Sequence, residues 1–246
     1  MKIARFSHEG SIAFGIVDDD ELVVLTGDPM FAGYDTTGDR VDLVDVKLLA
    51  PVIPRSKVVV LREGSGQDGA RPSFALKPNT AVVGPGDPIV IPAQSSDVTV
   101  TGALGIIIGT FARNVSIAEA PGVIFGYTVG ADVTARDLEQ QPDQSATASA
   151  FDSFSPLGPI IDTEYDPATA VIHGRINDGQ FQNSSAAVME HSVAEIVSFA
   201  SSIFTLLPGD VILAGVPGSS GTIEANDAVQ IEIPGIGVLV NSVRPA

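Results

Sequence analysis

The sequence predicts an α+β fold that is rich in β-strands, and three observations lead to that prediction. β-branched runs bounded by Gly, Pro or Asp recur along the main part of the chain, at residues 57–61, 104–108, 123–133, 210–214, 228–233 and 237–241. One segment alone carries a full set of helix signals, and the chain has no internal repeats. Strands should therefore outnumber helices, which favours a mixed, β-rich fold over a doubly wound α/β fold.

The first part of the chain is predicted to be a small β-rich segment, residues 1–53. Residues 3–26 are typical of two or three short strands with a turn at 18–20. Residues 27–40, rich in Gly, Asp and Thr, are typical of a loop. Pro51 and Pro54 interrupt the chain, so we place a boundary near residue 53 and assign residues 54–246 to the main domain.

The best helix signal begins at Ser192, which forms a capping-box pattern with Glu195. Apolar residues then follow at helical spacing as far as Leu207, and the Pro-Gly pair at 208–209 ends the pattern. A second, shorter helix is predicted to begin at Ser116 and to end at Pro121.

Composition and charge exclude several classes of partner. The chain has 246 residues, 44% of them hydrophobic, and its 30 acidic against 13 basic residues give a net charge of −17. A negative field of this size repels the phosphate backbone of nucleic acids. No apolar run approaches the roughly 20 residues of a membrane span, and the N-terminus lacks the apolar stretch of a signal peptide. There is no Cys for a disulfide or a thiolate. We expect a cytoplasmic protein with neither nucleic-acid nor membrane partners.

Residues 122–140 contain the most informative motif. They resemble the signature strand of the fumarylacetoacetate hydrolase family, G-Y-x-x-x-N-D-(V/I/W)-(S/T)-A-R-D-x-Q. Fragments at 74–78, 83–89, 104–109, 151–159, 207–215 and 235–241 resemble other motifs of that family in the same order. The resemblance covers roughly residues 50–246. It implies a mixed β-roll core with few helices, a homodimer, and hydrolysis, isomerisation, tautomerisation or decarboxylation of small oxo compounds.

Many members of that family hold Mg²⁺ or Mn²⁺ through a Glu-x-Glu pair and the Asp that matches Asp132. In this chain the positions of the pair are Thr101 and Ala103. A single carboxylate is a poor site for a hard cation. We therefore predict no cofactor and no metal-ligand set. Mg²⁺ or Mn²⁺ is left open, because substrate oxygens could complete a site on Asp132.

Other departures from the family pattern fall at the same expected active site. The family Lys is replaced by Ser149, the pocket Gln by Glu139 and a pocket Thr by Val216. The lid segment, residues 61–70, has no His, and residues 186–189 lack the expected hydroxyl and carboxylate. These losses predict a pocket that is more apolar than one built for an oxo-diacid.

Four residues are the candidate catalytic groups: Asp132, Arg136, Glu139 and His191. Arg136 could pair with Asp132 as a structural ion pair, or it could hold a substrate carboxylate or enolate. Asp132 becomes available as a general base if no metal occupies it. Glu139 is either an exposed loop carboxylate or a buried acid–base group with a raised pKa. His191 either packs at the helix N-terminus or shuttles protons.

The predicted substrate-binding residues are Arg62, Glu63, Lys77, Thr101, Tyr127, Ser149 and Val216. Arg62 and Glu63 lie in the lid and could replace its lost His and Glu. Lys77 is either a surface-turn residue or the nearest cation to the pocket. The Gly-rich run 215–221 is predicted to be a turn at the edge of the pocket.

The leading functional hypothesis is an enzyme on the fumarylacetoacetate hydrolase scaffold that acts on a small oxo, enol or polyketide-like compound, with specialised metabolism as the expected setting. Metal-independent acid–base chemistry would isomerise, cyclise or tautomerise the compound, or cleave a C–C bond. One alternative is a non-catalytic binding subunit. Another is a metal-dependent hydrolase or isomerase whose remaining ligands come from elsewhere in the chain.

Overall fold

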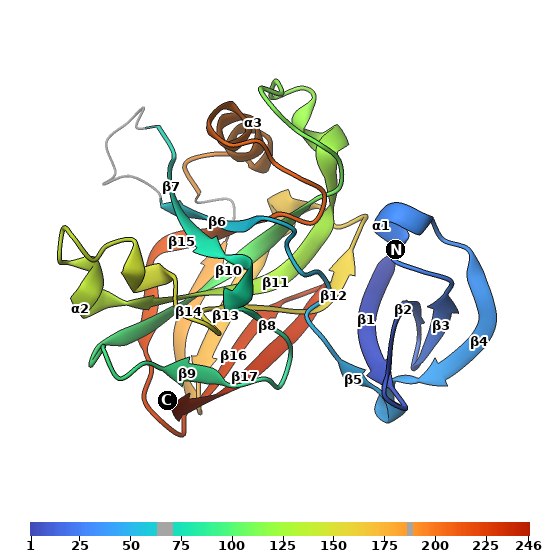
Figure 1. The fold of residues 1–246 in the computed structure, drawn as a ribbon, viewed down its shortest axis with the longest axis horizontal. Helices are drawn as coiled ribbons and strands as arrows, with labels where there is room; N and C mark the ends of the chain where they lie inside the picture. Colours follow the sequence, from blue (N-terminus) through green and yellow to red (C-terminus); the bar gives the residue numbers. More distant parts are fainter. Residues whose placement is uncertain (63–70, 186–188) are drawn as a thin grey trace.

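The computed structural model describes residues 1–62, 71–185 and 189–246, and the side chains of residues 216–218 lie outside that description. Within it, strands form a twelve-stranded and a five-stranded sheet (Figure 1). The larger sheet runs β4 (Thr36–Asp42), β3 (Glu21–Leu25), β2 (Ser11–Asp18), β1 (Lys2–His8), β12 (Ser155–Asp162), β11 (Ile124–Ala135), β10 (Val98–Ile108), β15 (Val211–Thr222), β6 (Lys57–Arg62) and β7 (Ser73–Pro78). β5 (Lys47–Leu48) pairs with β1, and β8 (Val82–Val83) with β12.

The smaller sheet runs β14 (Gly179–Ser185), β13 (Val171–Ile176), β16 (Ala228–Ile233), β17 (Gly237–Pro245) and β9 (Ile89–Ile91). The α-helices in the described part are α1 (Pro29–Ala32), α2 (Arg136–Glu139) and α3 (Val193–Ile203). The prediction of a β-rich fold with few helices is confirmed.

The N-terminal strands continue the large sheet, because β1 pairs antiparallel with β12 through Lys2 and Ile3. In Figure 1 these blue strands form one end of the molecule. The prediction that residues 27–40 form a loop was wrong, since α1 and β4 lie there. Asp28 caps α1 by accepting from the backbone N–H of Met30 at 3.0 Å. β4 is an exposed, polar edge strand, so it lacks the alternating hydrophobic pattern that would reveal a strand.

The capping box of α3 is confirmed, because Ser192 and Glu195 bond reciprocally. The helix ends at Ile203 rather than at Leu207. The predicted helix at Ser116 was wrong. The Glu119 carboxylate does accept from the Ser116 N–H at 2.9 Å. The segment then continues only as a short 3₁₀ turn over Ala120–Val123.

The two faces of β10 serve different purposes, since its side chains alternate. Val100 and Leu104 pack in the core against Ile172 and Ile231 of the smaller sheet. Gly102 lies between them, and a Cβ there would come within 2.9 Å of those two isoleucines. The opposite face carries Thr99, Thr101 and Ala103, which line a cavity.

A local irregularity interrupts the pairing of β10 with β15 beside that cavity. The register between β10 and β15 shifts between Thr101 and Ala103, so Gly102 has no partner in β15. The Gln182 side chain of β14 bonds to it instead. Its amide oxygen accepts from the Gly102 N–H at 2.8 Å, and its amide nitrogen donates to the Gly102 carbonyl at 3.1 Å. Gln182 thus holds this point of the strand from the side away from the cavity.

Asp210 fixes the start of the parallel pair β6–β15. The carboxylate is fully buried and accepts from the Ser56 N–H at 3.1 Å and from the Leu207 N–H at 3.0 Å. It also accepts from Lys57 Nζ at 2.6 Å. These bonds determine where β6 lies against β15, and β6 carries Arg62 at its far end.

Candidate active site

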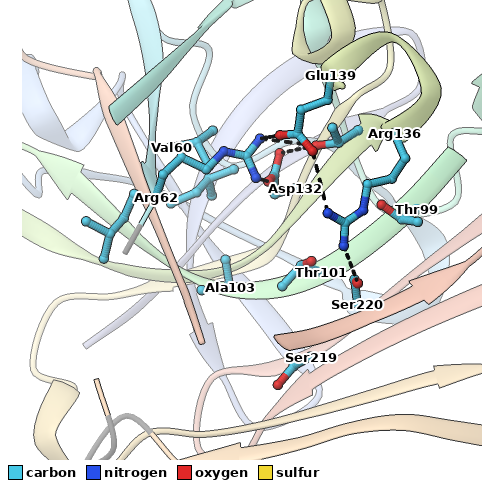
Figure 2. Close-up of a pocket in the computed structure, with 14 residues that line it drawn as sticks. Val60, Arg62, Thr99, Thr101, Ala103, Asp132, Arg136, Glu139, Ser219 and Ser220 are labelled. Atoms are coloured by element: carbon cyan, nitrogen blue, oxygen red, sulfur yellow. Dashed lines mark hydrogen bonds and ion pairs between the residues drawn. The ribbon is translucent and has the colours of Figure 1, made fainter. Parts of the chain in front are cut away.

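A cavity of about 280 Å³ opens on the face of β10, β11, β15 and β6, with α2 beside it (Figure 2). Its walls are mostly polar. They consist of Val60, Leu61, Arg62, Thr99, Thr101, Ala103, Asp132, Thr134, Arg136, Glu139, Leu213, Gly215, Ser219 and Ser220. Five of these side chains carry a hydroxyl and four carry a charge. The described walls are thus polar, and the prediction of a pocket more apolar than one built for an oxo-diacid stays a prediction. The loss of a polar side chain at Ala103 is outweighed by hydroxyls from neighbouring strands.

Asp132 lies at the back of the cavity with both carboxylate oxygens bound. Lys77 Nζ lies 2.7 Å from Oδ1, and Arg62 Nη1 lies 3.0 Å from Oδ2. The Lys77 side chain is fully buried and also donates to the carbonyls of Val133 and Phe154 at 2.6 and 2.7 Å. Burial lowers the pKa of Lys77, and the facing Asp132 carboxylate opposes that effect. The surface-turn interpretation of Lys77 was wrong, since β7 directs it into the interior.

Arg62 is held by several groups at the end of β6. Besides Asp132, its Nη2 donates to Thr134 Oγ1 at 3.2 Å and to Ser149 Oγ at 3.1 Å, and it lies 3.6 Å from Glu139 Oε1. Ser149 does not line the cavity, but its hydroxyl contacts Arg62, which does. The predicted association of Arg62 with the pocket agrees with this geometry.

Glu139 and Arg136 form the outer part of the site. Glu139 Oε2 lies 3.6 Å from Arg136 Nη1, and Arg136 Nη2 donates to Ser220 Oγ at 3.3 Å. Glu139 is 31% exposed and Arg136 is 46% exposed, so both can meet a molecule entering from solvent. The ion pair suggested between Asp132 and Arg136 does not form. β11 ends at Ala135, and the chain turns into α2, which directs Arg136 towards β15.

His191 and Tyr127 lie elsewhere. Both line a second cavity of about 580 Å³, which Pro121, Ile124, Met189 and Val193 help to form. Tyr127 is at the opposite end of β11 from Asp132. Burial, and then the charge of Asp166, raise the pKa of Tyr127 to about 12, so its hydroxyl stays protonated at neutral pH. The predicted catalytic role of His191 and substrate-binding role of Tyr127 find no support at Asp132, because both residues line this separate cavity.

Some predicted residues fall outside what the structure describes. Glu63 lies in the undescribed segment 63–70, and nothing is described of the Val216 side chain. The run 215–221 is part of strand β15 rather than a turn, but its predicted place at the edge of the pocket is confirmed, because Gly215, Ser219 and Ser220 line the cavity. Asp137, conspicuous in the signature motif, is a structural acceptor. It accepts from Ser95 Oγ at 2.6 Å and from the Ser96 N–H at 2.9 Å, and these bonds lower its pKa.

Two polar cavity residues, Thr99 and Thr134, were not singled out from the sequence, and Ser219 and Ser220 were included only as part of the run 215–221. Thr134 shares a strand face with Asp132 two residues away, and Thr99 likewise with Thr101, so strand periodicity could have revealed both. Ser220 lies opposite Thr101 across the β10–β15 pair. The register between β10 and β15 depends on the tertiary structure and could not be predicted from the sequence.

The donor set does not fit a divalent metal. Thr101 lies directly opposite Asp132 across the β10–β11 pair, and Ala103 follows on the same face. These two positions offer one hydroxyl and one methyl group in place of carboxylates, and both oxygens of Asp132 are engaged by cations. Within the described ranges, no three His, Cys, Asp or Glu residues are grouped so as to hold a metal ion. Nor does any helix in those ranges have the length and apolarity to cross a membrane.

Comparison with known proteins gives matches along the whole chain. Residues 58–244 match the fumarylacetoacetate (FAA) hydrolase C-terminal model, and residues 1–51 match the Rv2993c-like N-terminal model. The structure is similar to that of 5-carboxymethyl-2-hydroxymuconate delta-isomerase from Mycobacterium smegmatis, with a TM-score of 0.94, 36% identity and 100% of each chain covered.

Two further solved structures bear on the chemistry. A 2-hydroxyhepta-2,4-diene-1,7-dioate isomerase from Mycobacterium marinum has a TM-score of 0.93 and 39% identity, covering 100% of this chain and 98% of its own. A maleylpyruvate hydrolase from Sphingobium sp. SYK-6, in complex with manganese (II) ion and pyruvate, has a TM-score of 0.81 and 27% identity, with 100% of each chain covered.

Proposed function

The chain belongs to the fumarylacetoacetate hydrolase family, and from this premise we propose that it is an isomerase-type enzyme that moves protons on a small oxo or enol compound without a metal. One observation carries the proposal. Two arginines and a partly exposed carboxylate meet in a polar cavity that Asp132 of the signature motif also lines. The similarity to two isomerases supports this reaction class.

Glu139 is the proposed proton carrier. Its carboxylate is half-buried at the cavity wall, and both nearby guanidiniums are at 3.6 Å, too far for short hydrogen bonds. Asp132 is a poorer base, because Lys77 and Arg62 already occupy its two oxygens. Glu139 would take a proton from the carbon beside a carbonyl and return it to the enolate oxygen or, where a conjugated C=C bond extends the enolate to a dienolate, to the far carbon. That transfer isomerises the compound without a net change in atoms or electrons.

The proposed substrate is small and carries negative charge. A cavity of about 280 Å³ is at the lower end of the range for small-molecule sites. Its ion pairs comprise three cations and two carboxylates, which leaves one net positive charge in a chain whose total is −17. Arg136, the most exposed of these cations, is placed to hold a carboxylate of an oxo acid.

The test is turnover of a panel of oxo and enol acids in the presence of a chelator, followed by enol absorbance. Glu139→Gln keeps the shape of the side chain and removes the base, so kcat should fall on the order of 10²-fold or more. Glu224→Gln is the matched control, since Glu224 is exposed and does not line the cavity. Equal turnover by Glu139→Gln and the wild type would contradict the proposed role of Glu139.

Two other outcomes would support the alternatives. Tight binding of oxo acids with no turnover of any of them would favour a non-catalytic binding subunit. Turnover that requires added Mn²⁺ would favour the metal-dependent hydrolase or isomerase. The homodimer and the cytoplasmic location stay predictions, and light scattering of the purified protein measures the first of these.

A further inference from the structure

Arg62 lies beside the three strand positions that match the metal ligands of the family. Three strand positions converge there: Thr101 and Ala103 on β10 and Asp132 on β11, all lining one cavity. Only Asp132 has a carboxylate. The Arg62 guanidinium, which comes from β6, lies 3.0 Å from Oδ2 of that carboxylate. A positive charge therefore lies beside the one carboxylate of these three positions that could bind a metal ion.

The same guanidinium also contacts the position at which the family Lys is missing. Ser149 stands at the position where the sequence lacks a lysine, and Arg62 Nη2 donates to its hydroxyl at 3.1 Å. One planar group therefore spans from Asp132 to Ser149. Thr134 and Glu139 provide further contacts to Nη2, so the orientation of the guanidinium is fixed before any substrate binds.

Arg62 keeps capacity to bind a ligand in that fixed position. A guanidinium has five N–H donors. The contacts to described residues use Nη1 and Nη2 and leave Nε without a partner among those residues. The side chain is 32% exposed and lines the cavity. A fixed cation with a remaining donor, at the wall of a partly enclosed site, can stabilise an oxyanion as it develops.

We propose that the Arg62 guanidinium is the built-in electrophile of this site, replacing the divalent ion in charge and position and donating to the enolate oxygen of the substrate. The inference rests on the proposed function and adds to it the group that stabilises the intermediate. When Glu139 removes the proton, the C–H electron pair moves into the C–C bond and the carbonyl π pair moves to oxygen. Arg62 stabilises that oxygen until the proton is given back.

A second consequence concerns metal affinity. A divalent ion at Asp132 would have to displace Arg62 from Oδ2 and remain close to its charge and to that of Lys77. Repulsion between like charges at such distances is strong when they are partly desolvated. Supplying the two missing carboxylates would therefore restore metal binding fully only if Arg62 were also removed.

The first experiment measures binding rather than turnover. Oxalate, a planar dianion that resembles the enolate of an oxo acid, is titrated calorimetrically into the whole protein with a chelator present. Wild type should bind it. Arg62→Gln should weaken binding by at least about tenfold, because a charged hydrogen bond is lost, and Arg62→Lys should fall between them. Arg113→Gln is the matched control, since Arg113 lies outside the cavity and bonds to Thr205.

The second experiment measures Mn²⁺ binding by electron paramagnetic resonance. The variant Thr101→Glu/Ala103→Glu/Arg62→Ala should bind Mn²⁺ at least about tenfold more tightly than Thr101→Glu/Ala103→Glu alone. Equal affinities, oxalate binding that appears only after Mn²⁺ is added, or undiminished binding by Arg62→Gln would each overturn the inference. Oxalate binding that depends on Arg62 but comes with no turnover of any oxo acid would leave the inference standing and reject the proposed enzyme function.

Discussion

Lys77 shows how a single buried side chain can support a site without facing it. Its ammonium contacts Asp132 and two backbone carbonyls, and none of its atoms line the cavity. Because it neutralises Asp132 from behind, Arg62 can use the other oxygen and still face the cavity. Lys77 is therefore a positioning residue for Arg62.

Replacing Lys77 should cost stability as well as function. Lys77→Met keeps the length of the side chain but leaves Asp132 and two carbonyls without their donor, which should cost about 3–5 kcal/mol of unfolding free energy. Urea unfolding measures this. Lys47→Met is the control, since Lys47 forms an exposed ion pair with Asp87 and should lose less than about 1 kcal/mol. Equal losses in the two variants would show that the buried contacts do not stabilise the fold.

At the scale of elements, Asp210 links β6 and β15 and so places Arg62 relative to Ser220. Burial would raise the pKa of Asp210, but hydrogen bonds from Lys57, Leu207 and Ser56 together outweigh burial and lower it. A carboxyl whose pKa is lower in the folded state stabilises the fold above its ordinary value of 3.8. This contribution is lost as pH falls from that value through the folded-state pKa.

Asp210→Asn should therefore reduce both stability and its dependence on pH. At pH 7 the loss should be about 2–4 kcal/mol, because the buried bonds from Lys57 and the backbone are weakened. The difference between variant and wild type should shrink below about pH 4, where the carboxyl of the unfolded chain takes up a proton and the folded one, with its lowered pKa, does not yet. Denaturant unfolding across pH 3–7 checks this. A difference that stays constant over that range would contradict the assigned charge effect.

Strands with a regular run of β-branched residues could be predicted from the sequence. A polar strand at the edge of a sheet could not. The runs around Leu104 and Val129 are buried on both faces, so they show as β-branched segments. β4 is polar and exposed, and its pairing with β3 leaves no periodic signal.

For the site, Asp132, Arg136 and Glu139 could be identified from one sequence motif. The roles of Lys77 and Arg62 depend on how β6 pairs with β7 and with β15, and the second of these pairings joins distant parts of the chain.

At the scale of the whole molecule, a chain of net charge −17 contains a cluster of ion pairs at Asp132 and Glu139 with three cations and two carboxylates. An anionic substrate must cross a field from a net charge of −17 before it meets Arg136 and Arg62. Salt shortens the range of that repulsion, to a Debye length of about 10 Å at 0.1 M and about 3 Å at 1 M. The outer field is therefore screened more than the short contacts within the cavity.

Added salt should thus speed the association of anions with this protein. The on-rate of oxalate should rise several-fold between about 0.02 M and 0.3 M NaCl, the reverse of what an enzyme with a basic face shows. Stopped-flow binding measures the rate, and sucrose is the uncharged control for viscosity and osmotic effects. An on-rate that falls with salt would mean that local attraction by the arginines dominates the approach.

The two hydrogen bonds between Gln182 and Gly102 bear on how such a site can evolve. The backbone of β10 is held from the core side at the point where its two neighbours, Thr101 and Ala103, face the cavity. Mutations at these two positions can change the chemistry on one face while the hydrogen bonds that fix the strand stay on the other. The contacts that hold the strand in place are therefore separate from the side chains that face the cavity. A lineage can lose one reaction and acquire another there with little disturbance to the fold.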